Sequence, residues 1–152
     1  MTIKALLIDD LHSAMQNRDQ LRTGTIRMLL TAIKNEEVSG KEARELSDPE
    51  VITVLSREAK KRREAAEAYE QAGAKDRAAT EKAEGEIIAT YLPAQLSESE
   101  IKDLINAVIA ETGASGPQQM GLVMKSIQPK IAGRADGGLV SSLVKAALSG
   151  GN

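Results

Sequence analysis

Apolar residues recur every three or four positions through most of the 152-residue chain. This spacing places them on one side of an α-helix, so the pattern predicts a series of amphipathic helices. In the first part of the chain we expect a helix after Thr2, a second over about 19–38, a third over 48–72 and a fourth over 75–92. The fourth repeats the narrow apolar seam of the long third helix, which predicts an antiparallel helical hairpin.

Local signals mark where these helices begin and end. Ser47 or Asp48 followed by Pro49 is an order typical of a helix N-terminus. Gly40 is expected to end the second helix in the left-handed conformation that glycine adopts without strain. In the fourth helix, Ala79 is expected to be one of the seam positions packed against the third.

A break in the pattern at the segment YLPAQLSESEI predicts a domain boundary. Pro93 cannot continue a helix, and Ser97 with Glu100 forms a capping box just before the next apolar run. We therefore expect an N-terminal helical domain over residues 1–93 and a smaller C-terminal domain of three helices over 94–152. Ser97 is assigned a structural role as a helix cap. The fold class predicted for the whole chain is all-α.

The residue composition supports an all-α fold and narrows the range of functions. Tyr69 and Tyr91 are the only aromatic residues, whereas strands favour aromatic and β-branched side chains. The same scarcity removes the stacking platforms on which single-stranded nucleic acids bind. Cysteine is absent, so disulfides and thiolate metal sites are excluded.

Charge and hydropathy limit the partners and the location. The net charge of −2 argues against a general polyanion binder, so any contact with nucleic acid must be local. Two aspartates occur by position 10, too early for the uncharged core of a signal peptide. Because no apolar stretch is long enough to span a bilayer, we expect a cytoplasmic protein without a membrane partner.

The segment KIAGRADGGLV, residues 130–140, lies at the centre of a local excess of positive charge between two predicted helices. Beyond Glu111 the chain carries four basic residues and a single acidic residue, Asp136. The basic residues are Lys125, Lys130, Arg134 and Lys145. This part of the sequence is therefore the candidate for contact with an anionic partner.

Two interpretations of this loop compete. Asp136 can cap the last helix by accepting a hydrogen bond from the amide of Gly138 or Leu139, which stabilises by about 1 kcal/mol. Alternatively, the glycine-flanked helix start can offer its amides to a phosphate, with Arg134 as a forked partner. Because an aspartate at those amides would repel an anion, we favour the cap for Asp136. Arg134, Lys130 and Lys125 stay available to contact a phosphate nearby.

Other candidate sites have simpler explanations. The run REAKKRRE resembles a nucleic-acid patch, but pairs such as Glu58 with Arg62 can neutralise it as a solvated helix face. His12 has no second ligand-type residue at metal-binding spacing beyond Asp9. Ser141 lacks a base partner, and no phosphate loop, dinucleotide fingerprint or amidase constellation occurs. We predict no catalytic residue, metal or cofactor.

Three segments, IRMLLTAIKNEE, YLPAQLSESEI and MGLVMKSIQPKIAGRADGGLVSSLVKAAL, resemble the YqeY family, also called the GatB/YqeY domain family. The resemblance covers essentially the whole chain. It implies a helical domain joined to a smaller domain similar to the tail of the B subunit of the glutamine-dependent tRNA amidotransferase. In that enzyme the tail contacts the elbow of tRNA, whereas the amidase and kinase-like chemistry lies in other domains.

The resemblance and the local charge together define the residues expected to contact RNA. These are Lys125, Lys130, Gly133, Arg134, Gly137 and Lys145, with Asp136 as the neighbouring cap. The function expected is a non-catalytic adaptor that binds tRNA or associates with an amidotransferase or other translation protein. The alternative is a protein-interaction module of the translation machinery that docks through the hairpin. Carbon–nitrogen ligase activity with glutamine as amido donor, the usual family label, is the less favoured hypothesis.

Overall fold

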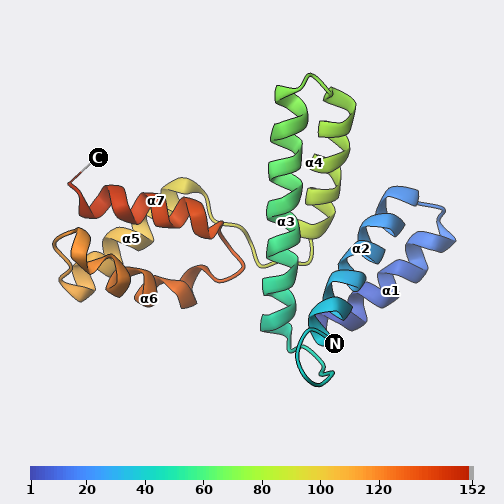
Figure 1. The fold of residues 1–152 in the computed structure, drawn as a ribbon, viewed down its shortest axis with the longest axis horizontal. Helices are drawn as coiled ribbons and strands as arrows, with labels where there is room; N and C mark the ends of the chain where they lie inside the picture. Colours follow the sequence, from blue (N-terminus) through green and yellow to red (C-terminus); the bar gives the residue numbers. More distant parts are fainter. Residues whose placement is uncertain (151–152) are drawn as a thin grey trace. The chain divides into compact units, whose positions relative to one another are not determined.

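The computed structural model describes residues 1–150, and every regular element in that range is a helix (Figure 1). The elements are α1 Ile3–Gln16, α2 Gln20–Glu37, α3 Asp48–Gln71, α4 Lys75–Ala89, α5 Glu98–Thr112, the 3₁₀ helix η1 Pro117–Gln119, α6 Met120–Ile131 and α7 Gly137–Leu148. The prediction of an all-α fold is therefore confirmed.

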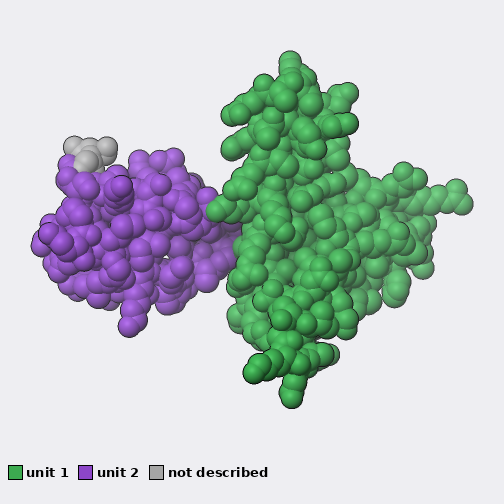
Figure 2. Space-filling view, in the orientation of Figure 1, with its two compact units in different colours: residues 1–93 green, residues 94–152 purple. Residues whose placement is uncertain are grey.

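The chain divides into two compact units, Met1–Pro93 (unit 1) and Ala94–Asn152 (unit 2), which Figure 2 shows in different colours. Each unit has a hydrophobic core of its own. The fully buried side chains of unit 1 include Leu7, Ile26, Leu29, Ile33, Leu55 and Ile88. Those of unit 2 include Ile101, Ile105, Val108, Val123, Ile127, Val140 and Val144. Neither described core contains a residue of the other unit.

The hairpin predicted in unit 1 is formed by α3 and α4, which lie side by side in Figure 1. The turn between them contains Gly73 in the left-handed conformation, with φ of 78°. This turn sets the rotation of α4, so that Ala78 is buried and Ala79 faces solvent. The prediction that Ala79 lies in the seam was therefore wrong by one position.

The end of α2 also differs from the prediction, because a buried carboxylate organises it. The α2 helix ends at Glu37, and Gly40 is not left-handed. The Glu37 side chain accepts hydrogen bonds from Lys4 Nζ at 2.9 and 3.0 Å and from the amide of Leu46 at 3.4 Å. The hydrogen bond from Lys4 lowers the pKa of Glu37 below its usual value. These contacts fold the following loop back over the helix end, so that no glycine cap is needed.

Polar pairs, rather than large apolar side chains, join the outer part of the hairpin. Arg62 of α3 reaches across to Glu81 at 3.4 Å and Glu84 at 3.3 Å on α4, while Glu58 pairs with Lys61 at 3.0 Å. The predicted pair of Glu58 with Arg62 is thus replaced by a contact between helices. Between Arg62 and the turn at Gly73, and along the facing part of α4, the buried apolar side chains are Ala66 and Ala78. Lys82 also pairs with Glu70, and Arg77 lies 5.8 Å from the centre of the Tyr69 ring.

Replacing Gly24 with alanine is expected to stabilise unit 1. Gly24 lies inside α2, and a Cβ added there would meet no atom within 4 Å. Since glycine is less favourable than alanine in a helix interior, we expect the free energy of unfolding to rise by about 0.5–1 kcal/mol in urea denaturation. The matched control is Gly73→Ala, whose positive φ predicts a loss of about 1 kcal/mol. A destabilised Gly24→Ala variant would contradict this reasoning.

Candidate nucleic-acid interface

The candidate site is the loop of residues 132–136, which connects α6 to α7 in unit 2. Gly133 has φ of 72°, a left-handed conformation that glycine adopts without the strain of a Cβ. The next amide, that of Arg134, donates to the carbonyl of Ile131 at 2.8 Å and closes a tight turn. The sequence therefore needs glycine at this position for a conformational reason, whatever the loop binds.

The carboxylate of Asp136 caps α7. Its Oδ1 accepts a hydrogen bond from the amide of Gly138 at 3.4 Å, which occupies one of the amides that a phosphate would need. In the same unit, Ser97 Oγ caps α5 by accepting from the amide of Glu100 at 3.1 Å. The Ser97 hydroxyl donates in turn to Glu100 Oε1 at 3.0 Å. These contacts give both side chains a structural role.

Arg134 links the loop to the segment 94–96, which precedes α5. The Nε of Arg134 donates to the carbonyl of Ala94 at 3.0 Å, and the carbonyl of Arg134 accepts from the amide of Leu96 at 2.8 Å. A third bond runs from Gln95 Nε2 to the carbonyl of Gly133 at 2.8 Å. No sequence signal predicts this link, because Ala94 and Arg134 are 40 residues apart and a backbone carbonyl has no side-chain signature.

The guanidinium of Arg134 keeps donors for a ligand. A guanidinium has five N–H donors, and the bond to Ala94 uses only the one at Nε. Within residues 1–150 its terminal nitrogens form no ion pair with a carboxylate. The side chain is therefore held at one edge while its forked end stays available.

The predicted lysines are spread over unit 2 rather than gathered at the loop. Lys130 lies in the last turn of α6 and pairs with exposed Glu111 of α5 at 3.6 Å. Lys125 is five residues earlier, so it faces a direction about 140° away around the helix axis. Lys145 lies in the last turn of α7, roughly 12 Å along the axis from Gly137. The loop itself thus brings together Gly133, Arg134 and Gly137, with Lys130 nearby.

Sequence reasoning missed a polar contact in unit 1. The hydroxyl of buried Tyr91, two residues beyond the end of α4, donates to Asp10 Oδ2 of α1 at 2.5 Å. Burial, reinforced by this hydrogen bond, raises the pKa of Tyr91 to about 12. No periodic signal identifies such a pair, since its members are 81 residues apart. It ties α1 to the end of the hairpin.

Residues 1–150 contain neither a metal-binding group nor a membrane-spanning helix. No group of three His, Cys, Asp or Glu side chains in residues 1–150 is placed to hold a metal ion, and His12 is exposed. Over the same residues, no helix combines the length and the apolar character needed to cross a membrane.

Fold and site together define an all-α protein of two helical units, the second of which carries Arg134 in the loop between its last two helices. A family model described as Yqey-like protein matches residues 4–148, nearly the whole chain. The chain therefore belongs to the YqeY family, and the resemblance noted from its motifs is confirmed.

Two relatives carry the name "Altered inheritance of mitochondria protein 41, mitochondrial". The one from Lachancea thermotolerans is 32% identical over 148 residues, covering 95% of this chain and 78% of the relative. The one from Clavispora lusitaniae is 30% identical over 139 residues, covering 90% of this chain and 79% of the relative. Both names refer to mitochondria, and neither states a ligand.

Proposed function

We propose that this chain is a non-catalytic adaptor that binds structured RNA, specifically tRNA, through the loop 132–136 of unit 2. The observation that carries the proposal is the arrangement of Arg134. Its guanidinium is fixed at Nε by the carbonyl of Ala94, and its forked end has no carboxylate partner in residues 1–150. A pre-positioned guanidinium loses less conformational freedom when it binds a phosphate, and its planar fork matches phosphate oxygens.

The absence of aromatic residues from the sequence of unit 2 favours structured RNA over a single strand. Both tyrosines, Tyr69 and Tyr91, precede residue 94, so unit 2 offers no aromatic ring for a base to stack on. Folded RNA is instead recognised largely by its shape and through its phosphates and 2′-hydroxyls. With Arg134 and Lys130 as the cations at the loop, one or two phosphate contacts give weak binding, with log K falling against log salt at a slope of about −1 to −2.

The protein partner and the location form part of the same proposal. The resemblance to the amidotransferase tail supports an amidotransferase or another translation protein as a partner. We keep the cytoplasm as the predicted location of this chain, although both relatives are named as mitochondrial proteins. Carbon–nitrogen ligase activity with glutamine as amido donor stays the less favoured hypothesis, and glutaminase turnover by the purified chain would revive it.

The proposal is tested by fluorescence anisotropy with labelled tRNA at low and moderate salt. We expect Arg134→Ala to weaken binding roughly tenfold, since it removes a charged hydrogen-bond donor, and Lys130→Ala to weaken it less. The matched control is Lys41→Ala, which removes an equal charge from an exposed loop of unit 1. Equal affinities for all four proteins would refute the site, and a wild-type chain that does not retain tRNA would refute the function.

A further inference from the structure

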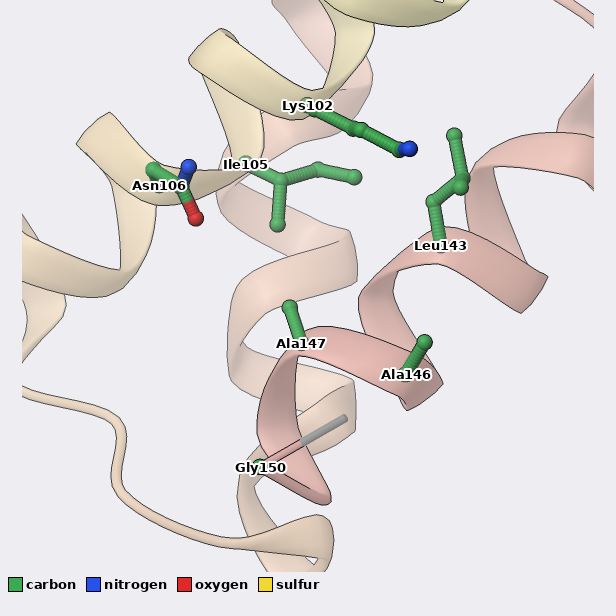
Figure 3. Close-up of a pocket in the computed structure, with 7 residues that line it drawn as sticks. All are labelled: Lys102, Ile105, Asn106, Leu143, Ala146, Ala147 and Gly150. Atoms are coloured by element: carbon green, nitrogen blue, oxygen red, sulfur yellow. The ribbon is translucent and has the colours of Figure 1, made fainter. Parts of the chain in front are cut away.

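Unit 2 contains a cavity of about 320 Å³ between α5 and α7, which Figure 3 shows with its lining side chains. The cavity is lined by Lys102, Ile105, Asn106, Leu143, Ala146, Ala147 and Gly150. It exists because the last turns of α7 present small residues opposite α5. Ile105 and Leu143 give it an apolar wall on each side.

Two polar side chains of α5 stand at this cavity. Lys102 and Asn106 are four residues apart, so they project from the same side of the helix. In Figure 3 the Lys102 side chain extends from α5 toward Leu143. The Asn106 side chain is exposed, so its amide is accessible to a ligand in the cavity. Lys102 pairs with Glu98 at 3.4 Å, but both side chains are exposed, and exposed pairs of this kind are weak and readily exchanged.

We propose that this cavity binds an aliphatic carboxylate. The carboxylate would accept hydrogen bonds from Lys102 Nζ and from the Asn106 amide, while a branched alkyl group of leucine size packs against Ile105, Leu143 and Ala147. A volume of about 320 Å³ is at the lower end of small-ligand pockets, which suits a group of that size. A phosphate fits less well, because a single cation and two aliphatic walls would leave most of its oxygens without donors.

This inference does not rest on the proposed RNA function. The cavity lies at the C-terminal end of α7, whereas Arg134 precedes its N-terminal end, roughly 15 Å away along the helix. A carboxylate with an aliphatic group has two sources, a free small acid or the C-terminus of a peptide that ends in leucine. The chemistry recognised is the same in both, so two probes are needed to tell them apart.

The test is a titration of the full chain followed by methyl NMR signals of Ile105 and Leu143. We expect 4-methylpentanoate to shift both signals, and its neutral isostere 4-methylpentanamide to bind at least fivefold more weakly. The Lys102→Gln substitution should weaken binding of 4-methylpentanoate by a similar factor and leave tRNA binding unchanged. The peptide acetyl-Gly-Gly-Leu with a free carboxylate is the second probe. Tighter binding of the peptide identifies a protein C-terminus as the source, and tighter binding of the acid identifies a small molecule.

A second variant tests the cavity itself. Ala146 is exposed at the rim, so Ala146→Leu fills the space without altering the core. It should abolish the shifts while the rest of the spectrum stays as in the wild type. The proposal is overturned if neither probe shifts Ile105 and Leu143. It is also overturned if 4-methylpentanamide binds the wild type as tightly as 4-methylpentanoate does. The same holds if 4-methylpentanoate binds the Lys102→Gln variant as tightly as it binds the wild type.

Discussion

Replacing Ile127 with alanine should unfold unit 2 under conditions in which unit 1 stays folded. Ile127 is fully buried on α6, and its core consists only of residues from unit 2. Truncating a buried isoleucine to alanine costs about 2–5 kcal/mol, because apolar contacts are lost and a cavity stays behind. In a small unit that loss is a large part of the total stability. Urea titration followed by circular dichroism should show a separate early transition.

The matched control for Ile127→Ala is Leu29→Ala, which truncates a fully buried residue in the core of unit 1. This variant should lose the helical signal of unit 1 first and leave unit 2 intact. Amide spectra can assign each transition to its unit. If both variants instead shift one common transition by similar amounts, the two cores stabilise each other and the reasoning from separate clusters is wrong.

Removing the Arg134 side chain should loosen the segment 94–96. The Arg134→Ala variant loses the bond from Nε to the carbonyl of Ala94, a charged hydrogen bond that contributes about 1.5–3 kcal/mol. Hydrogen exchange at the Leu96 amide, which donates to the carbonyl of Arg134, should therefore accelerate roughly tenfold or more. The Ile101 amide, bonded inside the first turn of α5, serves as an internal reference. Unchanged exchange at Leu96 would show that the guanidinium does not hold the segment.

Arg134→Lys separates the two roles given to this residue. Lysine keeps the positive charge, but an ammonium cannot reproduce the planar guanidinium whose Nε donates to the Ala94 carbonyl. We expect Leu96 to exchange almost as fast as in Arg134→Ala. If Arg134→Lys also loses tRNA affinity, the guanidinium geometry matters for RNA. If it keeps the affinity, the charge alone is sufficient and the link to Ala94 is a purely structural feature.

The helix starts could be predicted from the sequence because capping is local. Thr2 accepts from the amide of Ala5, Ser47 precedes α3, and Asp136 accepts from Gly138, all within three residues of chain. The errors have tertiary causes. The cap predicted at Gly40 is unnecessary because the Glu37 contacts end α2, and the seam position predicted for Ala79 depends on a helix register that the turn at Gly73 sets.

The candidate site was only partly predictable for a similar reason. The positive charges of the C-terminal part can be counted in the sequence, but their directions depend on helix rotation, and Lys125 and Lys130 point to different sides of α6. The attachment of Arg134 to Ala94 joins positions 40 residues apart. The cavity needs Lys102 and Asn106 of α5 to face the small residues at the end of α7, a pairing of helices that periodicity within one helix does not reveal.

The outer part of the α3 and α4 hairpin has a mechanical consequence. The outer part of the hairpin is stabilised by contacts between alanines and by surface ion pairs. Separating the helix ends near Gly73 therefore exposes little apolar surface to water. Transient fraying at the tip therefore costs little free energy, whereas the base of the hairpin stays packed around Leu55. We therefore expect amide hydrogens at the tip of the hairpin near Gly73 to exchange faster than those at its base.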